Sequence, residues 1–168
     1  MALALGWGFA EATFFFLVPD VCLTFLALRS PATALKASLW ALAGAVAGGC
    51  LMYLWGRWAP ESARAFLTHV PAIKQRLVER VNSEVEMRGA VAILLGPLKG
   101  TPYKIYAVEW GVLRRGLAEF LLVSIPARYP RFLLSVLLTV ALRGFISTTV
   151  LAVFWVVLYG FYFKKFGW

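Results

Sequence analysis

Most of this chain consists of long apolar stretches, most of them interrupted by proline or glycine. One short charged stretch separates the first stretches from the later ones. Residues 2–28 are apolar and are split by Pro19 next to Asp20. Residues 35–57 form a clean apolar run that, as a helix at about 1.5 Å per residue, spans roughly 30 Å. Because proline removes a backbone N–H and lipid cannot satisfy the groups that it frees, the first break predicts a re-entrant hairpin.

The same pattern then occurs a second time. Residues 90–113 are apolar and are broken around Pro97 and Pro102. A long apolar run follows at 117–142, and a last one at 145–163. We expect Pro19, like these two prolines, to act as a hinge, because each leaves backbone groups without helical partners.

Between the two units, residues 59–88 mix charged residues with isolated apolar ones. Ile73, Leu77, Val81 and Val85 recur every four residues. This spacing predicts an amphipathic helix that lies either on the membrane surface or against the protein itself.

These elements predict an all-α integral membrane protein in one domain, residues 1–168. Residues 1–58 and 89–143 each supply a broken hairpin followed by a span. A single span per unit inverts the second unit relative to the first, as in transporters that hold their substrate near the bilayer midplane. The expected architecture is two inverted re-entrant-hairpin-plus-span repeats and a C-terminal transmembrane helix.

Composition and charge support a membrane location and give it an orientation. The chain is 61% hydrophobic with a net charge of +9, whereas a soluble domain is nearer half apolar. The layout places most bases on the side of the charged segment: Arg57, Arg64, Lys74, Arg76, Arg80, Arg88, Arg114, Arg115, Lys164 and Lys165. The other side receives Arg29, Lys36 and Arg143. The positive-inside rule then predicts that residues 57–88 and the C-terminus are cytoplasmic, facing anionic lipid headgroups, and no nucleic-acid motif is visible.

Six charged residues lie inside the apolar stretches, where each costs about 2.5–3.5 kcal/mol on insertion scales. These six lie near the proline breaks or in the middle of a stretch, away from its ends: Glu11, Asp20, Lys99, Lys104, Arg128 and Arg131. A chain keeps such residues when they find partners or line a wet cavity. The acids come from the first half and the bases from the second, which predicts a polar site where the halves meet.

We expect the four bases to bind substrate, because an arginine fork matches phosphate and a lysine adds positive charge. The two acids could exchange a proton in a low-dielectric site and so couple transport to protons or ions. The alternative is a purely structural network in which Glu11 pairs with Arg128 or Arg131. For Asp20, a capping role at the start of the following helix stays equally open. Glu109 is expected to form a surface or interface ion pair.

Neither a nucleophile–base pair nor a metal-ligand cluster is visible, so we expect no enzyme activity, cofactor or metal site. Gly44 and Gly48 form a small-residue face that could pack within the chain or between two copies, which leaves a homo-oligomer open.

These residues resemble the DedA family of the VTT, or SNARE-associated-like, membrane proteins. The resemblance covers residues 5–143. It is carried by Glu11 with Pro19-Asp20, by a glycine-rich span ending in Tyr53-x-x-Gly56-Arg57, and by the second hairpin, Leu95 to Lys104. Lys99 and Lys104 stand where the family usually has two arginines, and Gly49 stands where it often has an acid.

The resemblance implies re-entrant hairpins in a prokaryotic inner membrane, with the family's membrane acids at Glu11 and Asp20. It also implies lipid translocation: a flippase or scramblase for phospholipids or polyprenyl phosphates, proton-coupled in some members. One alternative is a small proton- or cation-coupled antiporter for a soluble solute. The other is a non-transporting assembly factor that docks a partner through Ile73, Leu77 and Val81.

Overall fold

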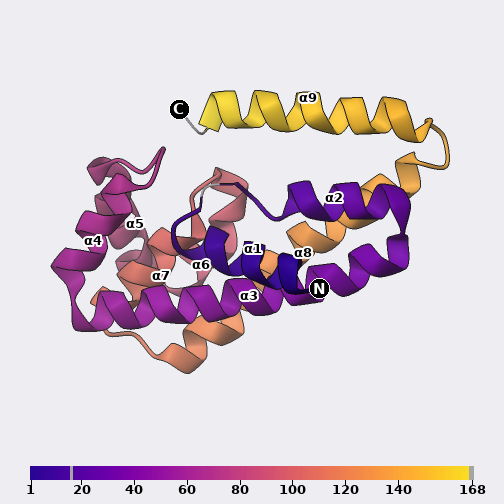
Figure 1. Cartoon of the computed structure of the whole chain (residues 1–168). Helices are drawn as coiled ribbons and strands as arrows, with labels where there is room; N and C mark the ends of the chain where they lie inside the picture. Colours follow the sequence, from indigo (N-terminus) through magenta and orange to yellow (C-terminus); the bar gives the residue numbers. More distant parts are fainter. Residues whose placement is uncertain (16, 167–168) are drawn as a thin grey trace.

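The computed structural model describes residues 1–15 and 17–166, and its secondary structure over these residues is entirely helical (Figure 1). The elements are α1 (Ala2–Thr13), α2 (Asp20–Arg29), α3 (Pro31–Trp58), α4 (Pro60–His69), α5 (Gln75–Arg88), α6 (Ala90–Leu95), the 3₁₀ turn η1 (Pro97–Lys99), α7 (Tyr103–Val112), α8 (Leu117–Leu142) and α9 (Thr148–Phe166). The expected all-α class is therefore confirmed. The side chains of Phe163 and Lys165, which belong to the expected final span and its basic end, lie outside the described part.

The first apolar stretch is not one helix, because the chain leaves helical geometry between α1 and α2. Pro19 stands immediately before α2, where its missing N–H does no harm. The Trp7 indole nitrogen donates to the Leu17 carbonyl at 3.1 Å, which folds the connecting loop back onto α1. At the other end of α2, Ser30 caps α3, and Pro31 occupies the first position of that helix.

Helix α3 is the long element against which α1 and α2, here called the first hairpin, and α7 of the second hairpin (α6, η1 and α7) pack, and glycine permits the close approach. A Cβ at Gly44 would lie 2.0 Å from the Leu5 carbonyl oxygen, and one at Gly8 would lie 2.1 Å from that of Ala41. The backbones of α1 and α3 therefore touch, which only residues without a Cβ allow. The small-residue face that includes Gly44 packs within the chain.

Helix α7 approaches the other half of α3 in the same way. A Cβ at Gly56 would lie 2.3 Å from the Val108 carbonyl oxygen, and one at Gly111 would lie 2.1 Å from that of Tyr53. The two short helices α1 and α7 thus dock on successive parts of one long helix.

The charged segment forms two helices, α4 and α5, joined by a turn at residues 70–74, and α5 is the amphipathic helix that the four-residue spacing predicts. Ile73, Val78, Val81 and Val85 are buried in the main core with residues of α6 and α7. Their apolar face therefore lies against the protein, which decides between the two surfaces that the periodicity left open.

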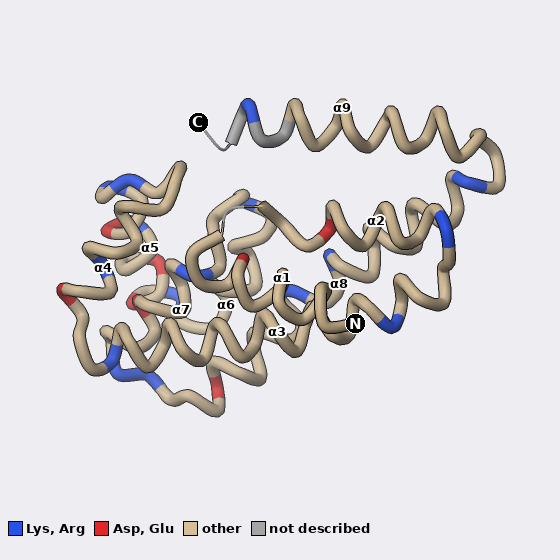
Figure 2. The backbone as a smooth tube through the Cα atoms, viewed as in Figure 1, with Lys and Arg blue, Asp and Glu red and all other residues tan. Residues whose placement is uncertain are grey.

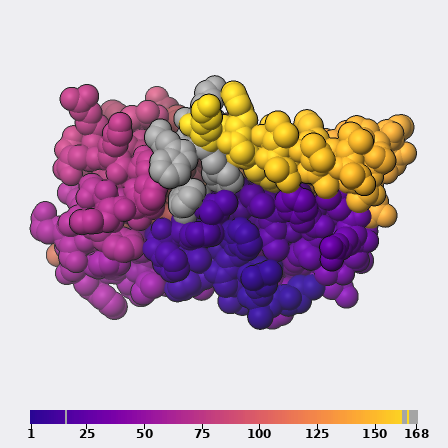
Figure 3. Space-filling view, turned by 45° about the horizontal axis from the view of Figure 1, so that its top comes forward, coloured from indigo at the N-terminus to yellow at the C-terminus, as the bar shows by residue number. Residues whose placement is uncertain are grey.

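Among the residues that the structure describes, α3 and α8 are long and apolar enough to cross a membrane. Helix α8 continues through Pro126 and Pro130, so the carbonyls one turn earlier lose their helical donors. The last expected span, 145–163, corresponds to α9, whose described apolar part is Thr148–Phe161. In Figure 3, α9 lies along the N-terminal helices, and Leu151 and Trp155 pack on Leu28 at this contact.

Candidate functional site

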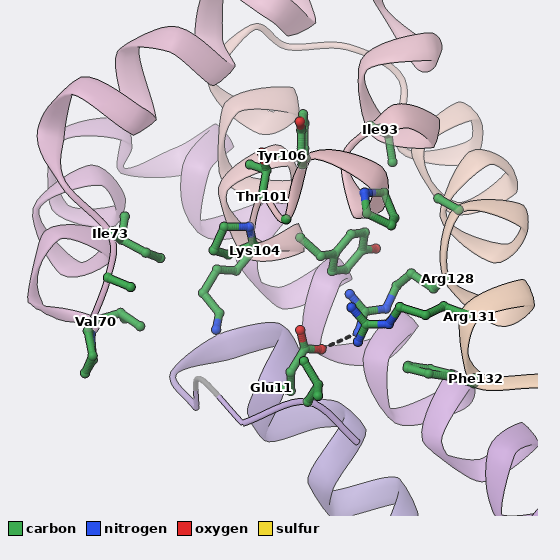
Figure 4. A pocket seen from close by; sticks show the side chains of 18 residues that line it. Glu11, Val70, Ile73, Ile93, Thr101, Lys104, Tyr106, Arg128, Arg131 and Phe132 are labelled. Carbon is green, nitrogen blue, oxygen red and sulfur yellow. Dashed lines mark hydrogen bonds and ion pairs between the residues drawn. The ribbon is translucent and has the colours of Figure 1, made fainter. Parts of the chain in front are cut away.

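Charged side chains from three helices converge on one cavity near the centre of the molecule. Glu11 of α1, Lys104 of α7 and Arg128 of α8 point toward one another from its walls (Figure 4). The volume of this inner cavity is about 90 Å³. All three side chains are buried, whereas a larger group of charged positions lies on α4 and α5 (Figure 2). The cavity lies where the breaks of the two hairpins meet, because Val18 and Pro102 also line it.

Glu11 and Arg128 form a buried ion pair through Arg128 Nη2. The Arg128 guanidinium also lies over the Tyr103 ring, 4.3 Å from its centroid, an arrangement in which cation and ring attract. The Tyr103 hydroxyl donates to Ser124 Oγ at 2.7 Å, which fixes the ring. Within the described part of the chain, Arg128 Nε is buried without a hydrogen-bond partner. Arg128 therefore keeps donor capacity that Glu11 does not use.

Lys104 links the two hairpins directly. Its ammonium donates to the carbonyl oxygen of Phe15, in the loop between α1 and α2, at 2.7 Å, and its side chain is buried. An ammonium carries three N–H donors. Among the described residues one carbonyl accepts from it, which leaves capacity for an anion in the cavity.

Asp20 and Arg131 form a second pair at 2.7 Å, and Ser135 Oγ donates to the other Asp20 oxygen at 2.7 Å. Asp20 begins α2, yet no side-chain capping bond is present at that end of the helix. Its carboxylate faces α8, so it pairs across the fold in preference to capping its own helix. The Arg131 side chain is 36% exposed and lines the inner cavity.

Lys99 lies away from this group. Its ammonium pairs with Glu84 of α5 at 2.9 Å, and it lines neither the inner cavity nor the one described next. Burial alone would raise the pKa of Glu84, but hydrogen bonds from Lys99 and Arg80 outweigh it and hold the pKa below its ordinary value. Lys99 thus fastens the tip of the second hairpin to α5.

A second, more open cavity of about 390 Å³ adjoins the first. This outer cavity lies between η1, α8 and α9, with Leu98, Leu138 and Trp155 in its wall. Of the expected hinge prolines, Pro97 lines both cavities and Pro102 the inner one, whereas Pro19 lines neither.

Glu109 is buried, not at the surface. Arg64 binds both of its oxygens, at 2.9 and 2.5 Å, and Asn82 donates to it at 2.7 Å. The expected ion pair is present, but it joins α7 to α4 and α5 inside the fold. This carboxylate clamps the amphipathic segment onto the second hairpin.

Sequence reasoning overlooked three polar partners at the site: Tyr103, Ser124 and Ser135. The sequence carried a signal for two of them, Ser135 and Tyr103. Ser135 follows Arg131 by one helical turn, so the two share a face. Tyr103 is the immediate neighbour of Lys104, in the segment that carried the family resemblance.

The charges of the group do not cancel. Lys104, Arg128 and Arg131 line the inner cavity together with one acid, Glu11. Asp20, bound to Arg131 at its edge, brings the balance to three bases against two acids. One excess positive charge in a confined site favours an anionic ligand.

Comparison with known proteins gives little beyond these observations. No family model matches the chain, and no solved structure matches it. A protein of Haemophilus influenzae, described as uncharacterized, is 25% identical over 127 residues. The match covers 76% of this chain and spans about 65% of the length of that relative.

Proposed function

We propose that this protein is an integral membrane protein of the DedA type that moves a phosphate-bearing lipid across the bilayer. The inner cavity is the observation that carries the proposal. It lies where two broken hairpins meet, its bases exceed its acids, and Arg128 and Lys104 keep unused donors. Helices α3 and α8 are long enough to place such a site within a membrane. Buried charges that line a cavity in such a protein are typical of a substrate pathway.

In this proposal the phosphate competes with Glu11 for Arg128. The guanidinium offers a planar fork that fits a carboxylate or a phosphate. When Glu11 takes up a proton, it no longer balances the guanidinium, and Arg128 turns its fork to the incoming phosphate. Release of that proton restores the ion pair and expels the phosphate. One carboxylate can in this way link proton uptake to lipid binding.

The test is translocation of headgroup-labelled phospholipid in proteoliposomes, with and without a pH gradient. We expect Glu11→Gln and Arg128→Ala to lose at least about tenfold of the wild-type rate, equivalent to about 1.4 kcal/mol. Glu119→Gln is the matched control, because Glu119 is an exposed acid outside the site. If folded Glu11→Gln transports as well as this control, Glu11 has no part in the mechanism. If folded wild-type protein moves no lipid of several classes, the proposal fails.

The same experiment separates the other two functions. An antiporter for a soluble solute would use the same acids, and a pH gradient would then drive solute accumulation instead of lipid movement. The assembly-factor alternative needs a free apolar face on α5 and the turn before it, but Val81 of α5 and Ile73 of the turn are buried in the protein's own core. A partner on that face would have to displace the core, which makes this alternative weaker.

A further inference from the structure

The inner and outer cavities are contiguous. Val18, Pro97, Gly100 and Arg131 line both of them. Arg131 stands at the junction, where it pairs with Asp20. A ligand that reaches Arg131 from one cavity therefore also meets the other.

The two cavities differ in chemistry. Beyond the junction, the inner cavity meets Glu11, Lys104 and Arg128. The outer cavity meets Leu134 and Leu138 of α8 instead, with Leu98 of η1 and Trp155 of α9. Its polar lining is Asp20 and Ser135, which are hydrogen-bonded to each other beside Arg131 at the junction, and Tyr159. Leu98, Leu134 and Leu138 are all exposed, so the outer cavity opens on an apolar surface of the molecule.

The cavities also differ in size. About 90 Å³ holds a few waters or one phosphate-sized anion, since a water occupies roughly 30 Å³. The outer volume of about 390 Å³ falls within the roughly 300–1,000 Å³ of small-molecule pockets. A small charged cavity beside a larger, mainly apolar one matches a molecule with a phosphate at one end and hydrocarbon next to it.

We propose that the two cavities form a single amphiphile site in which the outer cavity holds the hydrocarbon chain of the lipid whose phosphate occupies the inner cavity. Arg131 lies where the phosphate joins the chain. This inference rests on the proposed function and adds a position for the bound lipid, with its chain between α8 and α9. The charge complementarity of the adjoining chamber favours a lipid over a second protein chain as the occupant.

The outer cavity, a groove between α8 and α9, selects the lipid by shape and not by a gain in hydrophobic free energy. Lipid tails are as apolar as leucine, so a chain gains little by leaving the bilayer for the groove. A larger side chain in the groove should therefore exclude the lipid chain by steric overlap and leave the phosphate chamber unchanged.

The test compares two substitutions on α8. Leu138 lines the outer cavity and is 44% exposed, whereas its neighbour Leu137 is 49% exposed and lines neither cavity. Leu138→Trp should obstruct the groove, and Leu137→Trp adds the same indole to the outer surface. Leu134→Trp, also in the groove, serves if Leu138→Trp does not fold.

The probes are dioleoyl phosphatidic acid and glycerol 3-phosphate, which share the phosphate ester and differ in their chains. Binding to the purified full chain is measured by calorimetry, and retention of the lipid by native mass spectrometry. We expect Leu138→Trp to weaken phosphatidic acid binding about tenfold, equivalent to about 1.4 kcal/mol, and to leave glycerol 3-phosphate unaffected. Leu137→Trp should alter neither.

Three results would overturn the inference. In the first, Leu138→Trp and Leu137→Trp bind phosphatidic acid equally well. In the second, Leu138→Trp weakens the binding of glycerol 3-phosphate as much as that of the lipid. In the third, Leu138→Trp changes the oligomeric state, which would make the outer cavity a contact between copies. Transport is scored separately. If phosphatidic acid binding depends on Leu138 but no lipid is translocated, the amphiphile site stands and the transport proposal fails. If Leu138→Trp and Leu137→Trp translocate lipid equally well, the transport proposal stands and the amphiphile site fails.

Discussion

Replacing a single glycine with alanine should have opposite effects at two positions of the α1–α3 pair. A Cβ at Gly44 would lie 2.0 Å from the Leu5 carbonyl oxygen, while an ordinary contact is at least 3.4 Å, so the two backbones must separate by 3.4 − 2.0 = 1.4 Å. A Cβ at Gly6, within α1, would meet nothing within 4 Å. The two substitutions add the same methyl group to a helix and differ only in what it meets.

The expected magnitudes follow from two terms. Alanine is favoured over glycine in a helix by about 1 kcal/mol, so Gly6→Ala should stabilise the protein by about that amount. Overpacking costs about 1–3 kcal/mol, and the upper end applies at Gly44 because the obstacle is backbone of another helix. Gly44→Ala should therefore destabilise the protein by about 2 kcal/mol, a difference of about 3 kcal/mol between the variants.

The assay is thermal unfolding of detergent-purified protein, followed by tryptophan fluorescence. At about 2–4 °C per kcal/mol for a chain of this size, Gly6→Ala should melt roughly 6–12 °C above Gly44→Ala. If Gly44→Ala melts at or above Gly6→Ala, α1 and α3 do not touch at this position, and the arrangement of the first hairpin is wrong.

Two further outcomes concern the ion pairs. Arg128→Ala should destabilise the protein by about 3–5 kcal/mol, because it leaves a buried carboxylate without its partner. Adding Glu11→Gln should recover part of this loss, and in thermal melts a double mutant no more stable than Arg128→Ala would contradict the pairing. At the hairpin tip, the pKa of Glu84 is lowered in the folded state, so its stabilising effect is present above its ordinary pKa of 4.5 and is lost as the pH falls below that value. The melting-temperature gap between wild type and Glu84→Gln should therefore be wide at neutral pH and narrow in acid, and a gap independent of pH would exclude the charged pair with Lys99.

The sequence by itself determined the helical class, the helix breaks and the positions of the charged residues. These are local properties. Proline lacks a backbone N–H, so the break before Asp20 was visible in the chain. The four-residue spacing from Ile73 to Val85 fixed which face of that segment is apolar, and the length of the apolar runs marked α3 and α8 as candidate spans.

The sequence could not decide which charges meet. Glu11 and Arg128 are separated by 117 residues and Asp20 and Arg131 by 111, and no periodicity relates positions so far apart. The sequence predicted one group of four bases, but the structure keeps Lys104 with the two arginines and gives Lys99 to Glu84. That choice depends on how η1 is placed beside α5.

Tertiary structure also decided what the glycine face of α3 and the apolar face of α5 contact. The glycines of α3 could serve a second copy or the same chain, and the close approach of Leu5 to Gly44 settled it. The apolar face of α5 could lie on lipid or on protein, and α7 covers it. A small residue or an apolar face of a helix indicates only that another element can pack closely there. Which element does so depends on segments distant in the chain.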